Sequence, residues 1–208
     1  SSWRSRTRSK SSKSRCRTLS EPARGFAVVI SGPSGVGKST LVKRLVSAPK
    51  RRLAVSATTR APRTGEVDGV DYRFIDPAGF QSLVDSGRML EWAEVHGRRY
   101  GTPSDEVDPY VADGWLVVLD IDTQGFRSVR AKRPTTPGIF LAPPTLHELE
   151  RRIRGRGTED EATVQRRLAA AAAEIAFSGA YDATVVNDDA ARALAELEGL
   201  LEKLGASR

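Results

Sequence analysis

Residues 26–40 read FAVVISGPSGVGKST, a short apolar run followed by a glycine-rich stretch that ends in Gly37, Lys38 and Ser39. Five consecutive apolar residues are typical of a strand buried on both faces of a parallel sheet. From Gly32 onward the residues match G-x-x-x-x-G-K-[ST], a pattern whose glycines let backbone N–H groups converge on phosphate oxygens at a helix N-terminus. The stretch therefore predicts a strand, a phosphate-binding loop and a helix. A tight turn without a ligand is the less favoured interpretation, because the motif and its flanks agree.

The rest of the chain repeats this alternation of buried strand and helix. Further apolar runs lie at 115–119, 138–142 and 182–186, with a weaker one at 53–55. Helical patterns lie at 38–47, 103–113, 123–132, 145–154, 161–178 and 189–204. Strands that alternate with helices predict an α/β fold with a parallel sheet covered by helices on both faces. Residues 56–100 interrupt the alternation with short segments that we expect to form an inserted, mostly β module.

The net charge of +7 is carried by the first 24 residues, which hold eight of the 33 Lys and Arg residues and one of the 26 acids. Residues 25–208 are therefore neutral and lack the basic face that a nucleic-acid-binding protein needs. The tail, residues 1–24, is rich in Ser and Arg, so we expect it to be disordered, with at most weak and non-specific contact to polyanions. Its composition overlaps that of organellar transit peptides.

No apolar run approaches the length of a membrane span, and the tail has no apolar segment typical of a secretory signal. The single cysteine, Cys16, excludes an intramolecular disulfide and a cysteine-based zinc cluster. These features predict a cytoplasmic protein that does not enter a membrane. They do not indicate an oligomeric state.

Residues 58–72, TTRAPRTGEVDGVDY, place Arg60 and Arg63 in a segment broken by proline and glycine. Such a segment cannot form a regular helix, because proline removes a backbone donor and glycine loosens the chain. One interpretation is a solvated surface loop. The other is an anion site in which the two guanidinium groups grip a phosphate, with Tyr72 beside them.

Two further stretches fit phosphoryl transfer. The apolar run LVVLDID at 116–122 places Asp120 at the end of a strand, where an acid beyond a phosphate-binding loop helps to hold Mg²⁺. In residues 148–175, Arg152 and Arg156 share one side of a helical turn, and Arg167 follows after a glycine break. Arginines on a hinged segment suit a lid that closes over phosphates. Composition alone favours a solvated helical hairpin with Arg–Glu pairs.

Six motifs in order resemble those of the guanylate kinases: SGPSGVGKST, SATTRAPRTGEVDGVDY, EWAEVHGRRYGT, LDIDTQG, RGRGTEDE and VVNDD. The resemblance spans about residues 25–205. It implies in-line phosphoryl transfer from ATP to GMP, and to dGMP, with Mg²⁺ and domain closure. It also implies a division of residues 25–208 into a core (25–55, 101–150 and 176–208), a mixed α/β GMP-binding insert (56–100) and a helical lid (151–175).

The resemblance assigns roles to single residues. The ATP side would comprise Gly32, Pro33, Ser34, Gly35, Val36, Gly37, Lys38, Ser39, Thr40 and Asn187. The GMP side would comprise Arg60, Arg63, Tyr72 and Tyr100 at the phosphate, Ser56, Glu91 and Thr102 at guanine, and Gly101 and Asp122 nearby. Ser39 and Asp120 would hold Mg²⁺, and Lys38, Arg152, Arg156 and Arg167 would be the catalytic cations.

The chemistry of guanine agrees with the role implied for Glu91. Guanine presents adjacent N1–H and N2–H₂ donors, and one carboxylate can accept from both. This argues against a kinase for another nucleoside monophosphate, since adenine carries an acceptor at N1. A further alternative is a peptide-binding scaffold module of the guanylate kinase type. We disfavour it because a complete phosphate cradle has no use in a peptide binder.

Overall fold

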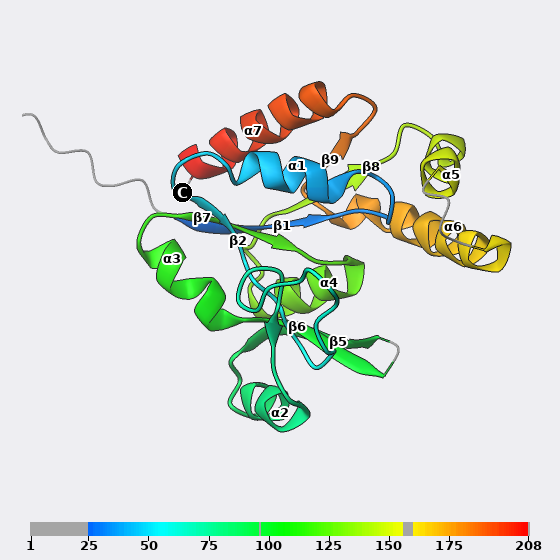
Figure 1. The fold of residues 1–208 in the computed structure, drawn as a ribbon. Coiled ribbons are helices and arrows are strands. Elements are labelled where there is room, and N and C mark those ends of the chain that lie inside the picture. Colours follow the sequence, from blue (N-terminus) through cyan, green and yellow to red (C-terminus); the bar gives the residue numbers. More distant parts are fainter. Residues whose placement is uncertain (1–24, 96, 156–159, 208) are drawn as a thin grey trace, which may run out of the picture.

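The computed structural model describes residues 25–95, 97–155 and 160–207, and within them five parallel strands form the central sheet (Figure 1). Their order is β2-β7-β1-β8-β9. The strands are β1 (Phe26–Ser31), β2 (Arg51–Leu53), β7 (Leu116–Asp120), β8 (Gly138–Ala142) and β9 (Ala183–Val186). The predicted fold class, a parallel sheet with helices on both faces, is confirmed.

Helices cover both faces of this sheet (Figure 1). On one face lie α1 (Lys38–Leu45) and α7 (Ala190–Ala206), and on the other lie α3 (Asp108–Ala112) and α4 (Thr123–Lys132). Two more helices, α5 (Leu146–Arg154) and α6 (Glu161–Ala176), pack against each other beside the sheet through a small cluster of their own. No helix of the described residues is both long and apolar enough to cross a membrane.

The apolar run of β1 explains its central position. Val28 and Ile30 face the cluster under α1 and α7, whereas Val29, between them, belongs to the cluster under α3 and α4. Successive side chains of a strand point to opposite faces, so a strand covered on both sides must be apolar at every position. All three side chains are fully buried.

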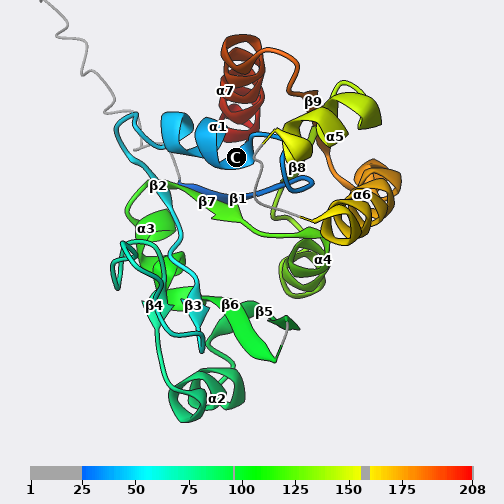
Figure 2. The same ribbon diagram turned by 45° about the vertical axis from the view of Figure 1, so that its right-hand side comes forward.

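A second sheet, with four strands among the described residues, lies below the first (Figure 2). Its order is β4-β3-β6-β5, with β3 (Ala57–Thr58), β4 (Arg73–Phe74), β5 (Met89–Val95) and β6 (Arg98–Pro103). The helix α2 (Pro77–Asp85) buries Phe80 and Leu83 against it. The start of β5 is fixed to the core, because Leu90 joins the cluster around α4 and Lys132 donates to the Met89 carbonyl at 2.8 Å.

The structure corrects several predicted elements. The helix predicted at 103–113 is a strand end at Pro103, a 3₁₀ turn η1 (Ser104–Glu106) and the short α3. Pro109 at the start of α3 explains the late onset, because proline is tolerated in the first helical turn but not inside a helix. The strand predicted at 53–55 lies at Arg51–Leu53, on the sheet edge. The inserted module also contains α2, capped by Asp76, so it is the mixed α/β insert that the resemblance implies rather than a mostly β module. A second 3₁₀ turn, η2 (Ser178–Ala180), follows α6.

Replacing Phe80 by alanine tests how much the small cluster of the second sheet contributes to stability. Phe80 is fully buried, so Phe80→Ala should lower the free energy of unfolding in urea by about 3–5 kcal/mol. Val67→Ala is the control, because Val67 is 56% exposed and its loss should change the free energy of unfolding by less than about 0.5 kcal/mol. Equal effects of the two substitutions would contradict the packing described for α2.

Candidate active site

The loop between β1 and α1 curves around an open cavity. A cavity of about 410 Å³ is lined by residues 32–35 and 37–40, together with Asp120, Asp122 and Glu174. The loop closes tightly against β8: a Cβ on Gly32, whose φ is +157°, would lie 2.4 Å from the Leu141 carbonyl oxygen. Only glycine fits there. The sequence motif thus forms a tight loop whose glycines line the cavity, as a loop that binds an anion through backbone N–H groups would.

Lys38 reaches across this cavity to a carboxylate. Its Nζ lies 2.6 Å from Oδ1 of Asp120, the last residue of β7, and both side chains are partly exposed to the cavity. Ser39 lines the same wall. The cavity wall therefore presents a cation and a hydroxyl from the start of α1 and a carboxylate from the end of β7, the groups that a nucleoside triphosphate and a hydrated divalent cation require.

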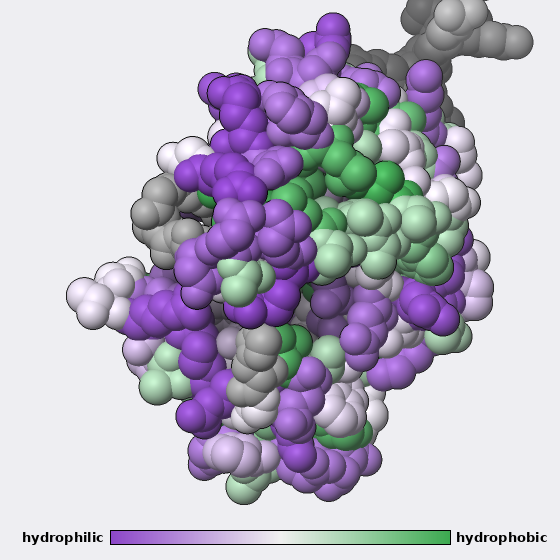
Figure 3. All heavy atoms as spheres, turned by 90° about the vertical axis from the view of Figure 1, so that its right-hand side faces the viewer, coloured by the Kyte–Doolittle hydropathy of each residue, from purple (hydrophilic) through white to green (hydrophobic). Residues whose placement is uncertain are grey.

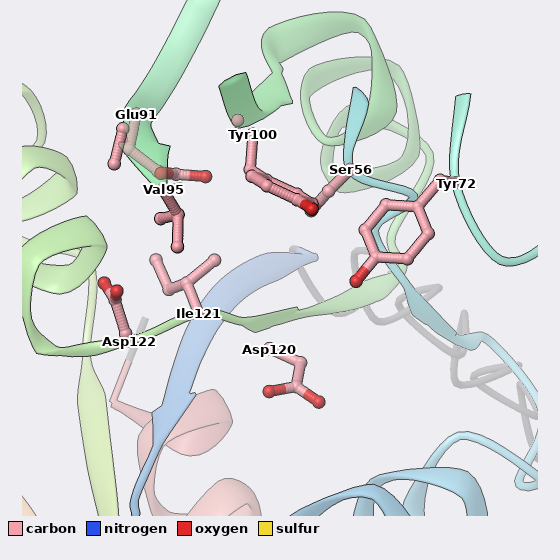
Figure 4. Close-up of a pocket in the computed structure, with 10 residues that line it drawn as sticks. Ser56, Tyr72, Glu91, Val95, Tyr100, Asp120, Ile121 and Asp122 are labelled. Atoms are coloured by element: carbon pink, nitrogen blue, oxygen red, sulfur yellow. The ribbon is translucent and has the colours of Figure 1, made fainter. Parts of the chain in front are cut away.

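A second cavity of about 290 Å³ adjoins the first and lies between the two sheets. Figure 4 shows Glu91 and Asp122 at one end and Tyr72 at the other, with Asp120 below. Ser56, Tyr100 and Gly101 complete the wall on the side of the second sheet. Asp120 and Asp122 line both cavities, so a ligand in either one meets the same two carboxylates.

Glu91 is the most deeply buried acid of the second cavity, with 6% of its surface exposed. Burial raises the pKa of its carboxyl above the ordinary range, and the nearby charge of Asp122 raises this pKa further. Thr102 opposes the shift by donating to Glu91 Oε1 at 2.7 Å, and Ser56 lies 3.4 Å from the Thr102 hydroxyl. Because Thr102 gives its proton to Glu91, it must rotate to donate to a ligand.

An acid that the sequence reasoning missed holds the guanidinium group of Arg60 and the backbone of Arg63. Glu66 accepts from both terminal nitrogens of Arg60, at 2.8 and 2.9 Å, and from the backbone N–H of Arg63 at 2.7 Å. These contacts lower the pKa of Glu66 to about 2. Arg60 also lies 5.4 Å from the ring of Tyr72, behind the cavity wall. The visible signal was an acid three residues after Arg63.

The structure describes two of the three predicted lid arginines, one on α5 and one on α6. Arg156 lies outside the described residues, and Arg167 is half-buried on α6. Arg152 donates to Glu148 at 2.8 Å and to the Val36 carbonyl of the phosphate-binding loop at 3.3 Å. The charged residues of α5 and α6 give much of the face in Figure 3 its hydrophilic character.

The structure adds details of three other residues that the sequence did not indicate. Asn187 lies behind the phosphate-binding loop and does not line the cavity in front of it. Asp122 caps α4 by accepting from the Gly125 N–H at 2.7 Å. Glu174, which sequence reasoning missed, lines the cavity of the phosphate-binding loop from α6, and burial raises its pKa. An acid within an alanine-rich run, AAAAAEIA, was the available signal.

The buried Glu91 should reduce stability at neutral pH. A carboxyl whose pKa is higher in the folded than in the unfolded state costs stability once it ionises, that is, above its ordinary pKa of about 4.3. Glu91→Gln should therefore raise the melting temperature at pH 7 by a few degrees, an effect of about 1 kcal/mol for a domain of this size. The advantage should vanish as the pH falls below about 4 in calorimetry. A less stable glutamine variant at pH 7 would contradict this account.

Comparison with known proteins shows the family of the chain. The family model described as "Guanylate kinase" matches residues 24–204. The guanylate kinase of Synechococcus sp. strain CC9311 is 54% identical over 82% of this chain and 90% of its own length. That of Mycobacterium tuberculosis is 50% identical over 85% of this chain and 86% of its own. A crystal structure of guanylate kinase from Anaplasma phagocytophilum is 34% identical, with a TM-score of 0.70 over 87% of this chain and 86% of its own. The chain therefore belongs to the guanylate kinase family.

Proposed function

We propose that the protein transfers the γ-phosphoryl group of ATP to GMP, and to dGMP, by direct in-line displacement. Family membership supports the phosphorylation of GMP by ATP. The observation that carries the proposal is the pair of adjoining cavities with Asp120 and Asp122 in their common wall. One has the phosphate-binding loop, and the other has a buried carboxylate suited to guanine. A donor and an acceptor placed in them would meet at these two aspartates.

The donor side would hold ATP with Mg²⁺. The Ser39 hydroxyl and the Asp120 carboxylate are oxygen ligands at the mouth of the loop, which fits this hard cation. Among the described residues no cluster of three or more acidic, His or Cys side chains could hold a metal. This agrees with a cation held mainly by phosphates and water. Bound Mg²⁺ would neutralise charge on the phosphates. Lys38 would exchange Asp120 for the β/γ-phosphates.

The acceptor side would recognise guanine through Glu91. Its carboxylate accepts from N1–H and N2–H₂, and Ser56 and Thr102 supply hydroxyl groups beside it. In contrast, adenine would set the N1 lone pair against a buried carboxylate. A site built to hydrogen-bond its substrate rejects an analogue that lacks the partner by roughly four orders of magnitude.

The phosphate of GMP would lie near Tyr72 and Tyr100, whose rings meet edge-to-face at 6.0 Å. Arg60 and Arg63 would supply the positive charge. Glu66 would orient Arg60 from the far side of the guanidinium group, leaving another edge of it for the phosphate. The attacking phosphate oxygen is already ionised, so the reaction needs no general base. Catalysis would rest on alignment and charge neutralisation, with Arg156 and Arg167 on the lid side and Arg152 held against the phosphate-binding loop.

The decisive experiment measures ADP release with ATP and each of GMP, dGMP, AMP, CMP, UMP and dTMP. We expect efficient turnover with GMP and dGMP, and kcat/KM lower by roughly four orders of magnitude with AMP. Glu91→Ala should lower kcat/KM for GMP by about a hundredfold and bring GMP and AMP closer together, because a charged hydrogen-bond partner is lost.

The matched control is Glu94→Ala, which removes an exposed acid from the same strand and should leave selectivity unchanged. Unaltered selectivity in Glu91→Ala would end the assignment of Glu91 to guanine. Absence of turnover with GMP in the wild-type protein would overturn the proposed function itself.

Domain closure is expected when both nucleotides bind. The two cavities are open, while phosphoryl transfer requires that two anions be brought together and water be expelled. Small-angle scattering should therefore show a smaller radius of gyration with a bisubstrate analogue that joins adenosine and guanosine through phosphates. ATP alone, or GMP alone, should give a smaller change. An unchanged profile at saturation would argue against closure.

A further inference from the structure

Asn187 follows β9 and is held firmly behind the phosphate-binding loop. Its Nδ2 donates to the Val36 carbonyl at 2.6 Å, and its backbone N–H donates to the Ala142 carbonyl at 2.8 Å. Only 6% of Asn187 is exposed, and it does not line the cavity in front of the loop. The side chain therefore acts on the loop itself in this conformation, rather than on the space in which a nucleotide would bind.

Arg152 holds the same carbonyl from α5. Its Nη1 donates to the Val36 backbone carbonyl oxygen at 3.3 Å and to the Asn187 backbone carbonyl oxygen at 3.0 Å. Its Nε is fixed in turn by Glu148 at 2.8 Å. Val36 is fully buried, so its carbonyl needs partners, and it finds two that come from different segments of the chain. The orientation of the peptide group that joins Val36 to Gly37 is thereby fixed from behind.

The direction of the next N–H follows from peptide geometry. In a planar trans peptide the C=O and N–H bonds point in opposite directions. Because the Val36 carbonyl points backward to Asn187, the Gly37 N–H points forward, toward the cavity that Gly37 lines. Within the described part of the chain this N–H donates to no atom. It is therefore free to donate to an anion in the cavity.

Gly37 is matched to this arrangement. Its φ is +95°, in the left-handed region, and a Cβ at this position would lie 2.6 Å from Asn187 Nδ2. The same contact that orients the peptide thus requires a residue without a side chain. The side chain of Asn187 therefore fits only if residue 37, 150 positions earlier in the chain, is glycine.

We infer that Asn187, with Arg152, is a positioning residue of the phosphate cradle, which aims the Gly37 N–H at the phosphate chain of the bound nucleotide. The resemblance alone implied a contact between Asn187 and adenine. The two roles differ in what they recognise: a positioning residue serves any polyphosphate, whereas an adenine contact serves only the base. The identity of the nucleotide as ATP rests on the proposed function, but the role of Asn187 toward phosphates does not.

Calorimetric titration of the full chain with inorganic tripolyphosphate, ATP and GTP separates these roles. Asn187→Ala and Asn187→Asp should weaken tripolyphosphate and ATP by the same factor, roughly ten- to a hundredfold, because the Val36 carbonyl loses its closest donor. The ratio of ATP to GTP affinity should not change. Weaker ATP binding with unchanged tripolyphosphate binding, and an altered ratio, would overturn the inference in favour of an adenine contact.

A control variant and a titration of the wild-type protein complete the test. Asp188→Ala removes the exposed neighbour of Asn187 and should leave all three affinities unchanged. In the wild-type protein, the amide resonance of Gly37 should shift when ATP or tripolyphosphate is added, and a resonance that does not move would contradict the inference. Neither titration involves GMP, so a failure to phosphorylate GMP would not affect the outcome.

Discussion

The Nζ atom of Lys38 lies 2.6 Å from Oδ1 of Asp120 because β1 and β7 are parallel neighbours in a fixed register, with Ile30 opposite Asp120. Parallel strands end at the same edge of a sheet, so the loop after β1 and the last residue of β7 must meet there. A shift of one residue would turn the Asp120 side chain to the other face of the sheet, away from Lys38. The chemistry of the site therefore depends on the packing of two buried strands.

The proposed recognition of guanine at the other end of the site lowers the stability of the protein. Glu91 lies among buried residues and is held by Thr102, yet burial still raises its pKa. A carboxylate that reads two adjacent donors must be shielded from water to discriminate well, and shielding makes its charge unfavourable before the ligand arrives. The close contact between β5 and α4 keeps this acid in place, since Leu90 and Lys132 tie the strand to the core.

The sequence was most informative where a residue's role follows from its own neighbours in the chain. The run 26–40 predicted β1, the loop and α1, and the apolar run before Asp120 predicted β7. Contacts between residues that are distant in the sequence could not be predicted in this way. Nothing near Asn187 in the chain indicates that its amide lies 2.6 Å from the Val36 carbonyl, because that contact depends on where β9 ends. Glu66 and Glu174 were missed for the related reason that acids on loops and helices are usually solvated.

The shared wall of the two cavities has a thermodynamic consequence. An anion that enters one cavity changes the electrostatic surroundings of Asp120 and Asp122 for any ligand in the other. If the first ligand separates Lys38 from Asp120, that separation is complete before the second arrives, and the second binds to a site already rearranged. The two affinities are then linked, and linkage requires that each ligand alter the other's dissociation constant by the same factor.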